Sequence, residues 1–65
     1  MKYSVRLPLV GMLSEDPRAR VIIIPAREMI EVLTAMDRRG LTQVQWGEIR
    51  LRVFTEDVID YCDPR

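Results

Sequence analysis

The strongest constraint on the fold is an alternating pattern on both sides of Gly47-Glu48. A two-residue loop with glycine first is typical of a type II′ hairpin turn, which would pair Trp46 with Ile49. In that register, one face collects the mostly apolar residues Thr42, Val44, Trp46, Ile49, Leu51 and Val53. The opposite face collects the polar residues Gln43, Gln45, Arg50 and Arg52. Because a slip of one residue would destroy this separation, we predict an antiparallel hairpin over residues 42–53 with one buried face.

Two segments before the hairpin also have strand patterns. Residues 3–9 alternate between apolar residues and polar residues or proline, which is the period of a half-buried strand. Pro8 cannot donate a ladder hydrogen bond, so this strand is expected to lie at an edge or to bend there. Gly11 indicates a bulge or a kink just after it. Residues 21–24 form a dense β-branched run that ends at Pro25, typical of a strand with both faces covered.

The C-terminal segment has the signature of a short helix. Thr55 is predicted to be its N-cap, followed by Glu56 and Asp57 in the first turn, where the helix dipole favours acidic residues. We expect one helical turn that ends before Pro64. Its apolar residues Val58, Ile59 and Tyr61 are then able to pack onto the sheet.

Residues 26–39 admit two interpretations. A helix would align the apolar stripe Ala26, Met29, Ile30, Leu33 and Met36, with Gly40 as the residue after its end. A strand would instead cover residues 29–33, and a polar loop would lead from Thr34 to Gly40. Local propensity favours the helix, although Ile24 would be a poor cap for it.

Four short motifs resemble a group of short, uncharacterised bacterial proteins. They are Ile23-Ile24-Pro25-Ala26, Ile30-Glu31-Val32-Leu33, Val44-Gln45-Trp46-Gly47 and Val53-Phe54-Thr55-Glu56-Asp57-Val58. The group's pattern is I-P-A-G, a hydrophobic strand, a polar loop, V-x-W-x-G and V-F-x-x-D-L. Arg27 stands where this pattern has glycine. The resemblance implies no activity.

The resemblance, which covers roughly the last two-thirds of the chain, favours the strand interpretation. It implies a mainly β fold, similar in outline to a small SH3-like barrel of about five antiparallel strands with a short C-terminal helical turn. The alternative is an α+β fold with a helix at about 26–39 packed on an antiparallel sheet.

The length and composition indicate a single domain over residues 1–65 that interacts with other molecules. A chain this short buries only about 60% of its surface on folding, yet 48% of its residues are hydrophobic. Exposed apolar surface, and therefore self-association, is expected. Ten basic residues balance ten acidic ones, which argues against nucleic acid and against a membrane surface. The single cysteine, Cys62, and the broken apolar pattern near the N-terminus predict a cytoplasmic protein.

The chain lacks the usual chemical groups of an active site. It has no histidine, which removes the commonest general base and metal ligand. Cys62 has no histidine partner and is expected to be an ordinary packed or surface thiol. The carboxylates Glu56, Asp57, Asp60 and Asp63 lack the spacing of a calcium loop and are interpreted as capping and solvated residues. We predict that the protein is not an enzyme and holds no metal or cofactor.

The best candidate interaction surface is the polar face of the hairpin with the residues around it. Arginine and glutamine on a sheet are suited to phosphates or to a partner's carboxylates. Phe54 pairs with Leu41 on this otherwise polar face, where the pair is expected either to cap the barrel or to form an apolar spot for a second subunit. Trp46 is expected to anchor the core. The candidate residues are Arg38, Arg39, Leu41, Gln43, Gln45, Arg50, Arg52 and Phe54.

This surface predicts a small binding module that acts through protein–protein contact and self-associates. The alternative is a small regulatory nucleic-acid-binding protein that uses the arginines. Nucleic acid is less favoured, because no aromatic side chain for base stacking stands among Gln43, Gln45, Arg50 and Arg52.

Overall fold

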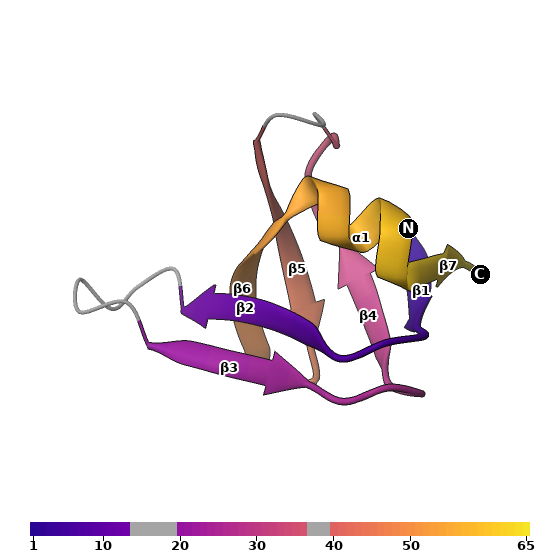
Figure 1. Cartoon of the computed structure of the whole chain (residues 1–65). Coiled ribbons are helices and arrows are strands. Elements are labelled where there is room, and N and C mark those ends of the chain that lie inside the picture. The colour runs from indigo at the N-terminus through magenta and orange to yellow at the C-terminus, as the bar shows by residue number, and fades with distance from the viewer. Residues whose placement is uncertain (14–19, 37–39) are drawn as a thin grey trace.

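The computed structural model describes residues 1–13, 20–36 and 40–65, which form one antiparallel sheet and one helix (Figure 1). The strand order is β3-β2-β6-β5-β4-β1-β7. The strands are β1 (Lys2–Val5), β2 (Leu9–Leu13), β3 (Val21–Ile24), β4 (Met29–Val32), β5 (Leu41–Trp46), β6 (Ile49–Phe54) and β7 (Cys62–Pro64). The helix is α1 (Thr55–Tyr61). A mainly β fold with a short C-terminal helix is therefore confirmed.

The central hairpin has the predicted register. β5 pairs with β6 from Leu41 opposite Phe54 to Trp46 opposite Ile49. Gly47 has a φ of 59°. Glu48 has no positive φ, since Arg27 is the only such non-glycine residue in the described chain. A positive φ at the first turn position alone is what a type II′ turn requires.

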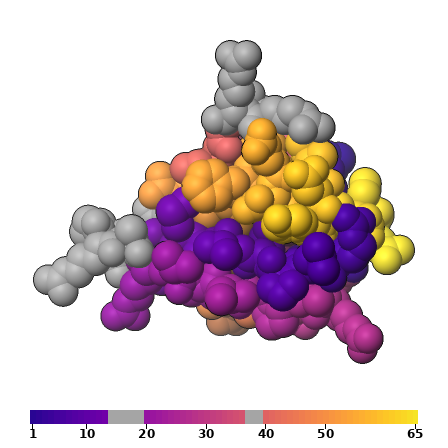
Figure 2. Space-filling view, viewed as in Figure 1, coloured from indigo at the N-terminus to yellow at the C-terminus, as the bar shows by residue number. Residues whose placement is uncertain are grey.

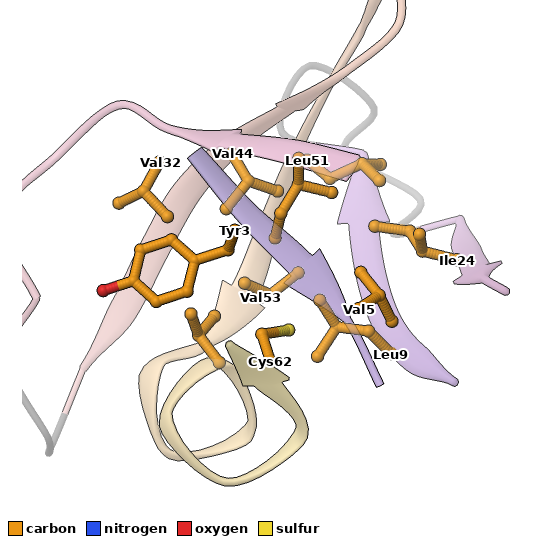
Figure 3. Packing of buried hydrophobic residues seen from close by; sticks show 11 residues of the cluster. Tyr3, Val5, Leu9, Ile24, Val32, Val44, Leu51, Val53 and Cys62 are labelled. Carbon is orange, nitrogen blue, oxygen red and sulfur yellow. The ribbon is translucent and has the colours of Figure 1, made fainter. Parts of the chain in front are cut away.

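The core lies on the concave side of the sheet, beneath α1 (Figures 1 and 3). Residues from every strand and from the helix contribute to it. They are Tyr3, Val5, Leu9, Ile24, Ile30, Val32, Val44, Leu51, Val53, Val58 and Cys62. Alternate residues of β5 and β6 point into this core, which is why the apolar face of the hairpin was readable from its period.

The N-terminal segment forms two strands, where one was expected. β1 ends at Val5 and β2 begins at Leu9, so the bend falls before and at Pro8, as the proline predicted. The two halves then serve different parts of the sheet: β1 pairs with β4 and β7, and β2 pairs with β3 and β6. This split, together with β7, raises the strand number above the expected five.

The predicted bulge at Gly11 is wrong. The β2 register runs through this residue without interruption, because Gly11 faces Ile22 on one side and Val53 on the other. A Cβ on residue 11 would lie 3.0 Å from Cδ1 of Leu51. The glycine is therefore explained by a close side-chain approach from β6 and not by backbone irregularity.

The prediction that β3 is covered on both faces is also wrong. β3 is a terminal strand of the sheet, and its only strand neighbour in the described chain is β2. Val21 and Ile23 are 62% and 61% exposed, whereas Ile24 is fully buried. A run of β-branched residues indicates a strand, but it does not indicate whether one face or both faces of that strand are covered.

The helix alternative for residues 26–39 is wrong over the described part, residues 26–36. β4 occupies Met29–Val32, close to the predicted strand, and residues 37–39 lie outside the described chain. Arg27 has a φ of 76°, in the left-handed region that favours glycine. Its N–H donates to the Val5 carbonyl at 2.7 Å. Pairing of β4 with both β1 and β5 satisfies its backbone and overrides the local helix propensity.

The C-terminal end differs from its prediction in three respects. Thr55 is the first helical residue and Phe54 is the N-cap, with no side-chain capping bond. The Oγ1 atoms of Thr42 and Thr55 lie 2.6 Å apart in a buried hydrogen bond. The helix extends to Tyr61, beyond one turn, and residues 62–64 pair with β1 as an unpredicted strand. Of its expected packing residues, Val58 is buried, whereas Ile59 and Tyr61 remain partly exposed.

Candidate interaction surface

The outer face of β3, β2, β6 and β5 points away from the core and carries the candidate residues. Side-chain alternation along each strand defines its members. They are Val21 and Ile23 from β3, Val10 and Met12 from β2, Arg50, Arg52 and Phe54 from β6, and Leu41, Gln43 and Gln45 from β5. In Figure 2, β2 and β3 form a continuous band of surface below the helix.

An apolar row crosses all four strands of this outer face. Ile23 faces Val10, and Phe54 faces Leu41. Between these pairs, Gly11 faces Val53, so the same register brings Val10 beside Phe54. The four side chains of the apolar row are 61%, 42%, 53% and 42% exposed in the order Ile23, Val10, Phe54, Leu41. Contiguous exposed apolar side chains of this kind are typical of interaction surfaces.

The next rows of the outer face become progressively polar. Val21 faces Met12, which in turn faces Arg52. Nε of Arg52 is buried, and within the described residues it has no hydrogen-bond partner. Nε of Arg50 donates to the side-chain oxygen of Gln45 at 3.2 Å, and the Gln45 amide donates to the Gly47 carbonyl at 2.9 Å. The Arg50 guanidinium is thus held toward the hairpin turn.

The structure brings together most of the residues predicted from the sequence. Leu41, Gln43, Gln45, Arg50, Arg52 and Phe54 all lie on the outer face. Arg38 and Arg39 lie outside the described residues. The β2 and β3 contributions were missed. The continuous run of residues 21–24 contains no polar residue that marks which side chains face solvent, so period alone could not assign them.

Trp46 lies at the rim of the core instead of at its centre. It packs against the buried cluster but is only partly buried, and its pairing partner Ile49 is exposed. The indole N–H of Trp46 donates to Oε1 of Glu28 at 2.9 Å. This bond satisfies the polar end of the ring, so Trp46 ties the hairpin to the turn that precedes β4.

The acidic residues of the C-terminal segment are accounted for in part by local contacts. Asp63 accepts a hydrogen bond from Nη1 of Arg6 at 2.7 Å. Glu56 and Asp57 lie in the first turn of α1, where the helix dipole favours them. Within the described residues, no group of three or more acidic, cysteine or histidine side chains is arranged to hold a metal ion.

The Cys62 thiol is buried at the start of β7. Burial, reinforced by the nearby Asp63 carboxylate, raises the pKa of this thiol from 9.0 to about 11. The thiolate is the reactive form of cysteine, so a raised pKa suppresses nucleophilic and redox chemistry at neutral pH.

We expect the thiol of Cys62 to resist modification in the folded protein. We also expect the free energy of unfolding to decrease at alkaline pH because of this thiol. The folded thiol holds its proton more tightly than the unfolded one, so stability is retained below pH 9 and falls as the pH rises towards about 11. When urea unfolding is measured between pH 9 and about 11, the free energy of unfolding should fall more steeply with pH for the wild type than for Cys62→Ala. Equal modification rates at pH 8 for native and urea-unfolded protein would contradict the prediction.

In the described chain, no helix combines the length and the apolar character needed to cross a membrane. Comparison with known proteins finds no matching family model, no similar curated protein and no similar solved structure.

Proposed function

We propose that this protein is a small binding module that works by protein–protein contact and self-associates through its outer face. The observation that supports this proposal is the apolar row, in which four neighbouring strands each expose a large apolar side chain. Such a row stays in contact with water in a monomer. Covering it with a partner removes apolar surface from water, which contributes about 25 cal/mol per Å².

Three further expectations belong to the same proposal. An SH3-like small barrel is supported by the sheet's curvature around one core and by the short helix after β6 (Figure 1). A cytoplasmic location is supported by Cys62, which is buried as a free thiol. A binding role without catalysis is supported by the suppressed reactivity of that thiol and by the lack of histidine.

The change Phe54→Asn tests the apolar row without weakening the fold. Phe54 is the N-cap of α1, a position where asparagine is among the preferred residues, so folding should be maintained. Light scattering behind a sizing column, over a wide concentration range, is expected to show self-association for the wild type and its loss or strong weakening for Phe54→Asn. The matched control is Leu7→Asn, which removes a similarly exposed apolar side chain from the bend between β1 and β2.

Association that survives Phe54→Asn would remove the apolar row from the proposal. A monomeric wild type at every concentration would remove self-association altogether.

The nucleic-acid alternative has its own test. We expect no binding of a fluorescent single-stranded oligonucleotide in an anisotropy assay at low salt, where phosphate contacts are strongest. Binding that is lost in Arg50→Gln/Arg52→Gln would instead support the alternative function. Burial of the Arg52 Nε and the bond from Arg50 to Gln45 both leave less of these guanidinium groups available for phosphate.

A further inference from the structure

The free edge of β3 presents a defined set of backbone groups. Leu13 donates to the Arg20 carbonyl at 3.1 Å, so this residue pair is a hydrogen-bonded one. Hydrogen-bonded pairs alternate with non-hydrogen-bonded pairs along an antiparallel ladder. Ile22 and Ile24 therefore bond to β2, whereas Val21 and Ile23 direct their N–H and C=O groups away from it. These are the groups that a further strand would meet.

Within the described residues, the short strand β3 itself carries no charged side chain, no proline and no bulge. Edge strands are commonly protected by a charged side chain, a proline, a bulge or a covering loop. β3 consists of four uncharged β-branched residues in regular register with β2, and its most exposed side chains are Val21 and Ile23. Pro25 follows only after the strand has ended. No other described strand lies on this side of β3.

We propose that β3 pairs antiparallel with β3 of a second copy of this chain, about a two-fold axis through Ile22. This inference rests on the proposed self-association but places the main contact at the β3 edge, beside the outer face. Val21 of one copy then faces Ile23 of the other, and each of these two pairs exchanges both N–H···O bonds. All the edge-directed groups of Val21 and Ile23 are satisfied by the same groups of an identical strand.

The neighbouring registers fit less well. A shift of one residue would set outer-face side chains against inner-face ones and mismatch the hydrogen-bonding groups. Pairing Ile23 with itself would set Val21 against Pro25, which has no N–H to donate. Pairing Val21 with itself would carry Ile23 beyond the start of the partner strand. The register centred on Ile22 uses the full exposed edge.

Side-chain placement agrees with this register on both faces. Ile22 packs against the core from the inner face, so its contact with Ile22 of the second copy would extend the two cores toward each other. On the outer face, Val10 and Ile23 of one copy would continue into Val21 and Met12 of the other. The apolar row of each copy would thereby be extended by Val21 and Met12 of the other, and the zero net charge offers no long-range repulsion between the copies.

Disulfide trapping tests the register directly. In the proposed dimer, Ile22 faces itself as a non-hydrogen-bonded pair, with Cα atoms about 4.5 Å apart. That separation lies within the range for a disulfide, whereas residue 21 would be about 8 Å from its own symmetry mate. Mild oxidation should convert Ile22→Cys into a covalent dimer but leave Val21→Cys uncross-linked. The wild type, with Cys62 buried, is the blank.

A second pair of variants tests the edge in solution. Val21→Lys/Ile23→Lys places charges on the edge and should reduce the mass seen by light scattering to the 7.6 kDa of one chain. Leu7→Lys/Ile59→Lys is the control, because it adds the same two charges at exposed apolar positions outside β3 and outside the outer face. It should leave more dimer than the edge variant does.

The outcomes separate this inference from the function on which it rests. A wild-type dimer that withstands both edge lysines, with no cross-link at position 22, overturns the β3 interface and leaves self-association standing. A wild type that is monomeric throughout overturns both. Cross-linking at position 22 with a dimer that persists in Phe54→Asn supports the β3 edge and argues against the apolar row as the main contact.

Discussion

Replacing Gly11 with valine is expected to destabilise the protein by about 3 kcal/mol. A Cβ at this position would lie 3.0 Å from Cδ1 and 3.2 Å from Cβ of Leu51, and 3.3 Å from Cγ1 of Val53. Both neighbours are fully buried in β6 and cannot move aside without disturbing the core. A chain of this length has a total stability of only about 3–10 kcal/mol, so such a loss would remove about a third or more of it.

Urea denaturation followed by circular dichroism measures this loss. Gly11→Ala should fall between the wild type and Gly11→Val, because it adds one methyl group in place of three carbons. Gly47→Ala gives a mechanistic contrast: nothing lies within 4 Å of its added Cβ, and its cost of about 1–2 kcal/mol comes from the φ of 59°. A Gly11→Val protein as stable as the wild type would show that β2 and β6 are not packed this closely.

Changing Thr42 to valine should cost about 2 kcal/mol, although the two side chains have almost the same shape. The hydroxyls of Thr42 and Thr55 bond to each other, and both residues have zero exposure. Removing one hydroxyl leaves the other buried without a partner, which destabilises a protein more than removing both hydroxyls does. Replacing both removes the polar groups together, so Thr42→Val/Thr55→Val should be nearly as stable as the wild type.

A double-mutant cycle over these two positions measures the coupling. The two single variants should each be destabilised, and the double variant should recover most of the loss. Thr42→Ser and Thr55→Ser are the controls, because they keep a hydroxyl and remove a methyl group. Additive losses in the double variant would show that each hydroxyl has another partner.

The hairpin was predictable because the information that specifies it is local. Gly47 sets the turn, and the alternation on each side then sorts apolar from polar residues over β5 and β6. The placement of β1 and β2 depends instead on which distant strands they meet, which no period within residues 2–13 encodes. The role of Thr55 also depends on a distant residue. Its side chain suits an N-cap locally, which is why the sequence predicts a cap, but in the structure its hydroxyl bonds to that of the buried Thr42.

The candidate surface was predictable only where it coincides with the hairpin. Phe54 and Leu41 were identified as an apolar pair because the turn fixed their register. Val10 and Ile23 continue the same row, but their position beside Phe54 follows from the pairing of β2 with β6, which joins segments far apart in the sequence. Strand order, not residue type, determines where the surface ends.

The pairing of β1 with β7 has a consequence for how the chain acquires its structure. β1 precedes the other described strands in the sequence, and it is flanked by β4 and by β7, which follows all of them. Because translation proceeds from the N-terminus, one side of β1 has no strand to pair with until residues 62–64 have left the ribosome. Closing a contact over nearly the whole chain carries a large entropic cost and slows folding. The sheet is therefore completed only once residues 62–64 have emerged, and β1 gains its second neighbour after the other described strands have formed.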